Sequence, residues 1–367
     1  MAIQRDQKGP THSRVLLILN ERTPRDAIDC YRALDRLESD GAVEAWSVYP
    51  YLARYSAGVA GEAMIAEIEQ EISVLNVTVL LFAHFHDVGV GAPSLARLRA
   101  LHPDMVVGFW EGDGYEPYRK PFPRGTLGNC VRCDVVFVCG DGYIVSLLKR
   151  HGCTDVRYVP STGDDRFVAQ PVRSTYEFDV AMIGSRMSSK LPFKRMPGSS
   201  MRRQLAARFT SRFGSRFAVF GSGWTGPSAH GPVPYAGQAE VYGRSAAVLG
   251  CNNLYAKYSF SDRLPIALQS GRPLIHEFVE GAQEVFGVDS GVRWFRSIEE
   301  ALHLTEEILN NPEQALVQAE RARLLAEDRF TTYDALGYMI RALNSKRRSC
   351  GGAGEIVDNP WIGRTNL

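Results

Sequence analysis

Apolar positions in the first half of the chain follow two alternating patterns. Short continuous apolar runs, typical of buried strands, alternate with longer segments in which apolar side chains recur every three or four residues, as in amphipathic helices. Strands are predicted at residues 14–20, 43–49, 77–83, 105–109, 135–139 and 156–159, and helices at 26–37, 62–75, 94–101 and 143–150. Strands that are apolar on both faces and alternate with helices indicate a parallel sheet covered by helices on both sides.

The second half repeats this alternation after a break. Residues 160–178 are rich in Pro, Ser, Thr, Gly and charge and have no sustained period, which is typical of a linker between domains. Beyond them, strands are predicted at residues 179–183, 217–220, 247–252, 274–275 and 292–295, and helices at 200–213, 238–245, 262–271, 298–309, 312–328 and 332–343. We therefore predict two α/β domains, residues 1–165 and 166–330. Residues 331–367 should supply a helix that packs back on the first domain, followed by a tail from about residue 346.

The predicted helix at residues 262–271 carries an unusual charge. Asp262 is a favourable N-cap, and Gly271 with Pro273 is a common way to end a helix. Arg263 places a cation against the positive end of the helix dipole, which is unfavourable unless an anion lies nearby. That anion is either a ligand phosphate or a local carboxylate such as Asp262, and the sequence leaves both open.

Two loops that follow strands of the second half could bind phosphate. Gly184 lets the backbone approach an anion closely, and Arg186 and Lys190 could neutralise a diphosphate. The alternative is a basic loop that faces solvent. In the motif FGSGW, Gly223 and Trp224 form a second glycine turn, which could equally be a tight turn with a packed tryptophan.

Candidate acid–base residues lie in the loops that follow strands of the first half. Ligands of parallel sheets bind at the carboxyl ends of the strands, where His84, His86 and Asp113 are found. Any of them could accept the proton of a hydroxyl, although Asp113 could also cap its own turn and the histidines could be core or surface residues. A zinc site would need further ligands, and the spacing shows none.

Composition restricts the partners. The 367 residues carry 42 Lys and Arg against 41 Asp and Glu, so there is no electrostatic signature of nucleic-acid binding. No apolar run reaches the roughly 18 residues that span a bilayer, and the start of the chain lacks the apolar segment of a signal peptide, so we expect a cytoplasmic protein without a transmembrane segment. Seven cysteines, including the pair Cys130 and Cys133, fit reduced thiols better than a disulfide framework.

Taken in order, several motifs resemble those of the CgeB-like glycosyltransferases, a family named for a spore maturation protein. The motifs of the first half are VVGFWEGDGYEPY, CDVVFVCGDGYIVSLLKRHG and VRYVPSTGD, and those of the second are DVAMIGSR, FGSGW, GPVPYAGQAEVYGRSAAVLGCNN, SDRLPIALQSGRPLI, EGAQEVF and FTTYDAL. The resemblance covers roughly residues 75–340, and its specificity comes from the order of the motifs. It implies the GT-B architecture, in which two Rossmann-like domains with doubly wound parallel sheets face each other across a cleft.

The resemblance also assigns roles to residues. In the donor half, Gly184, Arg186, Gly223, Trp224 and Arg263 match the family's motifs, and Glu284 matches the glutamate of its Glu-x-Phe motif. The chain departs from related enzymes at Ile266, where they usually carry a glutamate for the nucleotide ribose, so ribose binding at that position is in doubt.

The predicted function is transfer of a hexose or related sugar from a nucleotide-sugar donor, held by the second domain, to a hydroxyl of an acceptor held by the first. The family implies no obligatory metal and no cofactor apart from the donor substrate. The acceptor would be a glycan, a lipid-linked molecule or a small molecule. Two alternatives stay open: a nucleotide-sugar epimerase on the same fold, and a catalytically silent protein that binds a sugar nucleotide or glycan, which Ile266 favours.

Overall fold

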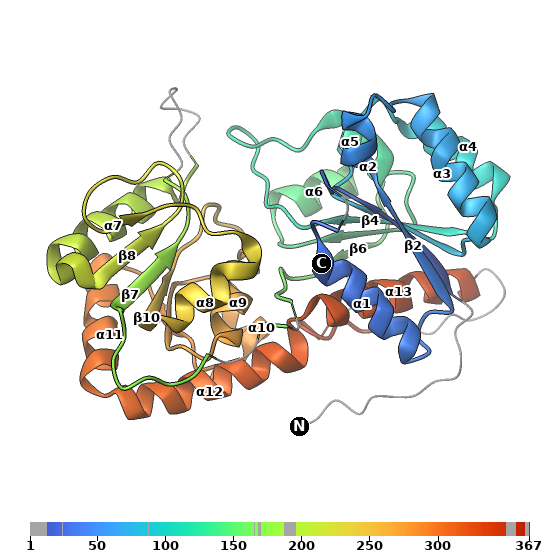
Figure 1. Cartoon of the computed structure of the whole chain (residues 1–367). Coiled ribbons are helices and arrows are strands. Elements are labelled where there is room, and N and C mark those ends of the chain that lie inside the picture. Colours follow the sequence, from blue (N-terminus) through green and yellow to red (C-terminus); the bar gives the residue numbers. More distant parts are fainter. Residues whose placement is uncertain are drawn as a thin grey trace.

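Two six-stranded parallel sheets form the framework of the protein. The computed structural model describes residues 13–23, 25–86, 88–164, 166–167, 170–186, 196–349, 357–363 and 367. Each sheet lies in its own domain, and helices cover both of its faces (Figure 1). The strand orders are β2-β1-β3-β4-β5-β6 and β12-β11-β10-β7-β8-β9, and every pairing between neighbours is parallel.

The first domain alternates strands and helices from residue 14 to residue 158. Its strands are β1 (Arg14–Leu19), β2 (Ala45–Pro50), β3 (Val79–Ala83), β4 (Val106–Glu111), β5 (Val135–Val138) and β6 (Val156–Tyr158). Its helices are α1 (Ile28–Ser39), α2 (Tyr51–Ser56), α3 (Glu62–Leu75), α4 (Ala92–Leu101), α5 (Arg124–Cys130) and α6 (Tyr143–Arg150). The last long helix of the chain, α13 (Thr332–Ser349), packs beside α1 and against β4.

The second domain is built in the same way. Its strands are β7 (Phe178–Ile183), β8 (Phe217–Phe220), β9 (Ala229–His230), β10 (Ser245–Gly250), β11 (Leu274–Glu277) and β12 (Arg293–Phe295). Its helices are α7 (Ser199–Phe213), α8 (Gln238–Gly243), α9 (Arg263–Gln269), α10 (Ala282–Phe286), α11 (Ile298–Asn310) and α12 (Pro312–Arg329), with short 3₁₀ turns at Gly214–Arg216 and Tyr235–Gly237.

Each continuously apolar strand contributes side chains to the hydrophobic cores on both faces of its sheet, because successive side chains point to opposite faces. In β1, Leu16 and Ile18 pack into the core under α3 and α4, whereas Val15, Leu17 and Leu19 pack into the core with α1 and α13. That second core continues into the other domain through residues of α9 and α12. The strand runs seen in the sequence are therefore explained by burial on both faces.

The sequence missed mainly short elements. Helices α2, α5 and α10 have seven residues or fewer, and β9 has two. Segments of that length contain too few turns or alternations for periodicity to show.

Both connections between the domains lie side by side. The first crosses at Gly163, whose N–H donates to the carbonyl of Phe330 at 2.9 Å, and the second crosses at Thr332, whose N–H donates to the carbonyl of Gly163 at 3.1 Å. Residues 357–363 cover this region, although the sequence suggested a tail. Trp361 is buried against Tyr158, and its indole N–H donates to the carbonyl of Arg329.

Candidate functional site

The strand order of the second domain indicates where a ligand is expected to bind. Neighbouring strands β7 and β10 lead to connections that run in opposite directions, because the order along the sheet reverses between them. Open α/β sheets bind ligands beyond the carboxyl ends of strands at such a switch point. In this protein those ends are Gly184, after β7, and Cys251, after β10.

The two glycine motifs predicted to bind the donor form one unit at this edge. The N–H of Arg186 donates to the carbonyl of Ser222 at 2.9 Å, and the indole N–H of Trp224 donates to the carbonyl of Gly184 at 2.6 Å. Gly221, with a φ of 143°, lies so close that a Cβ there would be 2.7 Å from the backbone of Gly184. Glycine is therefore required for the two loops to approach each other.

Arg202 of α7 is a site residue that the sequence analysis missed. It is 4% exposed, and its guanidinium donates to the carbonyl oxygens of Ser185 at 3.2 Å and Cys251 at 3.4 Å. It thereby joins the ends of β7 and β10 across the switch point. The only signal in the sequence was an arginine in the first turn of a helix, which is the same anomaly that drew attention to Arg263.

Arg263 opens α9 as predicted, and the side chain of Asp262 caps the helix by accepting the N–H of Arg263 at 3.0 Å. The Nε of Arg263 is buried and has no hydrogen-bond partner among the described residues. Burial raises the pKa of the Cys251 thiol, and the charges of Arg202 and Arg263 act on it in the opposite direction. Both cations therefore lie near the end of β10, while Arg186 is exposed and Lys190 falls outside the described residues.

Two carboxylates stand near this edge. Glu284 of α10 binds the hydroxyl of Tyr258 and, at 3.0 Å, the ammonium of Lys257, and it is about half exposed. Glu277, at the end of β11, is buried and accepts the N–H of Asn252 at 2.9 Å and the hydroxyl of Tyr255 at 2.7 Å. Burial raises the pKa of Glu277. Ile266, at the position of the family's ribose glutamate, is fully buried in the core.

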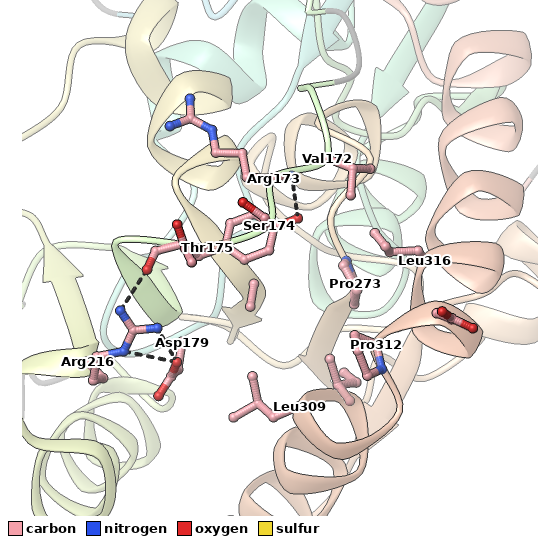
Figure 2. Close-up of a pocket in the computed structure, with 14 residues that line it drawn as sticks. Val172, Arg173, Ser174, Thr175, Asp179, Arg216, Pro273, Leu309, Pro312 and Leu316 are labelled. Atoms are coloured by element: carbon pink, nitrogen blue, oxygen red, sulfur yellow. Dashed lines mark hydrogen bonds and ion pairs between the residues drawn. The ribbon is translucent and has the colours of Figure 1, made fainter.

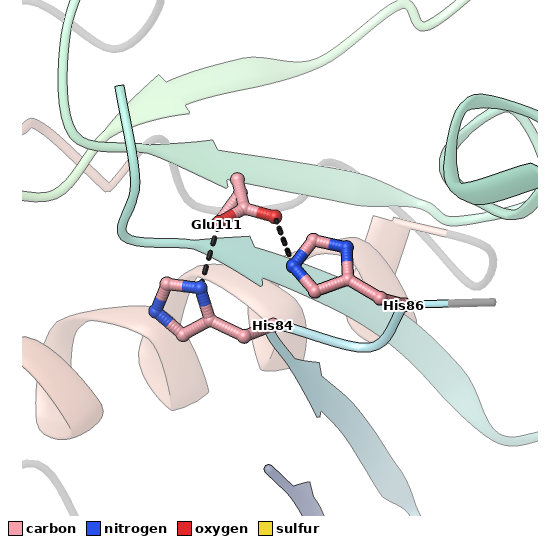
Figure 3. A group of neighbouring side chains, drawn as sticks. All are labelled: His84, His86 and Glu111. Atoms are coloured by element: carbon pink, nitrogen blue, oxygen red, sulfur yellow. Dashed lines mark ion pairs between the residues drawn. The ribbon is translucent and has the colours of Figure 1, made fainter. Parts of the chain in front are cut away.

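In the first domain, the structure gathers His84, His86 and Glu111 into one cluster (Figure 3). The Nδ1 of His84 lies 2.7 Å from Oε1 of Glu111, and the Nε2 of His86 lies 3.8 Å from its Oε2. The strand order of this sheet reverses between β1 and β3, so His84, directly after β3, stands at its switch point. Glu111 ends the neighbouring strand β4 and is fully buried.

The backbone around His84 is held in an uncommon conformation. His84 has a φ of 49°, in the left-handed region, although it is not a glycine. Its N–H donates to the carbonyl of Trp110 at 2.9 Å, and its carbonyl accepts the hydroxyl of Tyr51, which lies 3.3 Å from the N–H of His86. Such strain persists only where the surroundings enforce it, and it is common at functional sites.

The carboxylate of Glu111 dominates the electrostatics of this cluster. Burial acts to lower the pKa of His84, but the hydrogen bond and the negative charge of Glu111 outweigh it and raise that pKa overall. Oε2 of Glu111 is buried and has no hydrogen-bond partner among the described residues. Buried carboxylate oxygens without donors are costly, so this one favours a cation close by.

Asp113 occupies a different environment from the histidines. Its side chain is 55% exposed and forms an ion pair with Lys120 at 2.7 Å, while its N–H donates to Oε1 of Glu111 at 3.1 Å. The turn that holds Asp113 thus helps to fix Glu111. The carboxylate of Asp113 itself binds Lys120 at the surface, and its negative charge also acts to raise the pKa of His84.

The two edges meet through the loop at residues 251–262 of the second domain. The N–H of Asp141 donates to the carbonyl of Lys257 at 2.9 Å. A Cβ at Gly114 would lie 3.0 Å from Leu254, and one at Gly140 would lie 2.9 Å from Ser259. The turn after β4, which follows Glu111 directly, is therefore in contact with the second domain.

A cavity of about 530 Å³ lies elsewhere, at the opposite end of the second sheet (Figure 2). Its lining includes Asp179, Arg216, Ala246 and Pro273, which stand at or just before the amino ends of β7, β8, β10 and β11. Arg216 and Asp179 form an ion pair within it at 2.6 Å. Because ligands of such sheets bind at the carboxyl ends, this cavity is not the predicted donor site.

Comparisons with known proteins agree with the architecture. Residues 195–337 match a family described as glycosyl transferase-like. No curated protein matches the chain. Among the helices of the described residues, none is long and apolar enough to cross a membrane.

Several solved structures are similar to the whole chain. Sucrose-phosphate synthase from Thermosynechococcus elongatus has a TM-score of 0.60 at 10% identity, covering 92% of this chain and 100% of its own. HepE from Anabaena, in complex with UDP and glucose, has a TM-score of 0.56 at 11% identity, with coverages of 92% and 100%. A glycosyltransferase from Rickettsia africae has a TM-score of 0.55 at 10% identity, with coverages of 92% and 98%. The predicted fold is confirmed: the protein has the GT-B fold, with two Rossmann-like domains.

Proposed function

We propose that the protein is a glycosyltransferase that moves a sugar from a nucleotide-sugar donor to a hydroxyl of an acceptor. The observation that carries this proposal is the pairing of two chemically different edges in contact. A half-buried histidine paired with a buried glutamate stands at the switch point of the first sheet, and two arginines with a glycine unit stand at that of the second. The first edge can accept a proton, and the second can bind a diphosphate.

In the proposed mechanism, His84 activates the acceptor. With Nδ1–H donating to Oε1 of Glu111, the lone pair of Nε2 is free to accept the proton of the acceptor hydroxyl. The hydroxyl oxygen then attacks the anomeric carbon, and the bond from that carbon to the diphosphate oxygen breaks. The negative charge that builds on the leaving diphosphate is met by Arg263 and Arg186. This route inverts the anomeric carbon and needs no metal.

Arg202 has a positioning role in this scheme. Its guanidinium is already used to hold the carbonyl oxygens of Ser185 and Cys251, so it fixes the glycine loop and leaves Arg263 as the cation proposed to meet the diphosphate. UDP-sugars are the first donors to test, because HepE was solved with UDP-glucose. The ordered motifs further support membership of the CgeB-like family.

For the ribose, Glu284 is the proposed contact because Ile266 cannot accept a hydrogen bond. Glu277 is the alternative ribose contact, because its carboxylate binds the loop after β10 directly. Comparing donor affinity in Glu284→Gln and Glu277→Gln decides between them. If neither change weakens binding, the ribose is held by other groups.

The function is tested by mixing the protein with nucleotide sugars and acceptors and measuring free nucleoside diphosphate and the sugar products. A transferase releases diphosphate in an acceptor-dependent way. An epimerase converts the sugar without acceptor, and a silent binding protein binds the donor and does neither. Donors are first selected by thermal shift, since a ligand at 100 times its Kd stabilises by about 2.7 kcal/mol.

A further inference from the structure

We infer that His84, His86 and Glu111 form a binding site for a divalent transition-metal ion, for which Zn²⁺ is the appropriate probe. Nothing in the residue spacing predicted this site, because two histidines do not hold zinc without a third ligand. The fold supplies that ligand from β4, 25 positions after His86 in the chain. Two imidazoles and a carboxylate are a ligand set that Zn²⁺ accepts with further positions left open, whereas Mg²⁺ and Ca²⁺ prefer oxygen ligands alone.

The three donor groups are already near the required separations. One ligand atom from each residue lies within 4.8 Å of the other two. Bonds of about 2.0–2.1 Å in a tetrahedral arrangement place ligand atoms about 3.3 Å apart. The Nδ1 of His84 lies 2.7 Å from Oε1 of Glu111 and the Nε2 of His86 lies 3.8 Å from Oε2 of the same carboxylate, so these two separations lie on either side of that value. Small side-chain rotations are enough to admit an ion.

A second observation points independently to a cation. Oε2 of Glu111 belongs to a fully buried residue, faces His86, and has no hydrogen-bond donor among the described residues. A bound divalent cation would satisfy this oxygen and offset the cost of burying the carboxylate.

The surroundings orient the imidazole of His86 for binding. Its Nδ1 lies 3.5 Å from the hydroxyl of Thr126, which is fully buried on α5. Metal-binding histidines usually donate their second ring N–H to such a partner, which leaves the other nitrogen as the ligand. For His86 that other nitrogen is Nε2, the atom that faces Glu111.

The consequence of occupancy rests on the proposed function. An ion bound to Nδ1 of His84 takes the place of the single ring proton that this nitrogen donates to Glu111, and in the neutral ring that proton then resides on Nε2. His84 can no longer accept a proton from the acceptor. The ion and the acid–base pair therefore exclude each other, and Zn²⁺ should inhibit transfer reversibly.

Binding is measured first, without donor or acceptor. The full chain, purified without a histidine tag and stripped with EDTA, is titrated with Zn²⁺ against a chromophoric chelator, and bound metal is counted after dialysis. We expect one ion per chain, and Co²⁺ in its place should give the visible absorption of a low-coordinate site. His86→Ala removes a partly exposed ligand and should abolish both signals. Glu111→Gln should do the same, with circular dichroism to verify folding.

The matched control is His303→Ala, which breaks a surface histidine–glutamate pair of α11, His303 with Glu307 at 3.3 Å. It should leave uptake unchanged. No stoichiometric uptake by the wild type, or uptake that persists in both His86→Ala and Glu111→Gln, overturns the inference. Turnover with and without Zn²⁺ is compared last, so a protein that binds the ion but transfers no sugar refutes the proposed function and leaves the site standing.

Discussion

The two domains share one plan of strands and helices but carry opposite chemistry at the edges that meet. The edge of the first sheet presents imidazoles and a buried carboxylate, His84, His86 and Glu111. The edge of the second presents glycines and arginines, among them Arg202 and Arg263. Each set lies at the switch point of its own sheet. The fold thus determines where ligands bind, and the side chains at each switch point determine what they can bind.

A similar contrast appears between two histidines, the half-buried His84 and the buried His276. His84 has a carboxylate partner that raises its pKa, whereas His276, in β11, donates from Nδ1 only to the carbonyl of Glu277 at 2.7 Å, and burial lowers its pKa to about 4. The proposed mechanism uses the first histidine to exchange a proton, whereas burial keeps the second neutral.

The largest effect is expected for His84→Ala. Loss of a positioned general base should lower the turnover number by about 10²- to 10⁴-fold and leave donor affinity nearly unchanged, because the proposed donor site lies on the other domain. Steady-state kinetics and donor titration measure the two quantities separately. A variant with normal turnover but weakened donor binding would reverse the roles assigned to the edges.

Arg263→Ala should show the opposite pattern. Removing a charge-assisted contact to the diphosphate should cost about 1.5–3 kcal/mol of donor binding. Calorimetric titration with the nucleotide diphosphate measures this without turnover. Arg212→Ala, which removes an exposed partner of Glu306, is the matched control and should bind normally. Equal affinity in wild type and Arg263→Ala would remove this residue from the donor site.

The stability of the second domain should fall in mild acid because of His276. Its pKa is lowered by folding, so between about pH 6.5 and pH 4 the unfolded chain binds a proton that the folded chain does not. The contribution of His276 to the free energy of unfolding is therefore fully present above the pKa that this residue has in the unfolded chain, about 6.5. It is lost as the pH falls towards the folded pKa of about 4. Between pH 7 and pH 5 the loss should be on the order of 2 kcal/mol.

Urea unfolding at both pH values, compared with His276→Asn, isolates this contribution, since asparagine does not titrate. The variant should lose less stability than the wild type over the same interval. Identical losses would mean that His276 is protonated in the folded protein.

The smallest effect is expected for Asp113→Asn. Asp113 is exposed and paired with Lys120, so its charge should change turnover by less than about tenfold, well below the range for a general base. A fall of two orders of magnitude with an unchanged melting temperature would instead make Asp113 the base, as its position after β4 first suggested.

Hydrophobic periodicity was enough to predict the long elements, because strands such as β3 are buried on both faces and helices such as α3 carry a regular apolar stripe. It was also enough to place His84, His86 and Arg263 in loops at strand ends or at a helix start. These features depend on local sequence alone.

What the sequence could not provide was the pairing of distant residues. Glu111 read as the last residue of a strand, and only the parallel register of β3 and β4, with Ala83 opposite Trp110, brings it to His84. Arg202 likewise became a site residue because α7 carries it to the ends of two strands that are far apart in the chain. Period and composition contain no information about such tertiary contacts.

The paired crossings at Gly163 and Thr332 determine how the two halves can move. Since the two connections are hydrogen-bonded to each other, we expect them to act as a single pivot line about which one domain swings rather than slides relative to the other. In a rotation about this line, the displacement of each atom grows in proportion to its distance from the line. Residues beside the pivot, such as Trp361, would keep their neighbours, and the widest travel would fall on the rims of the two domains that lie farthest from it.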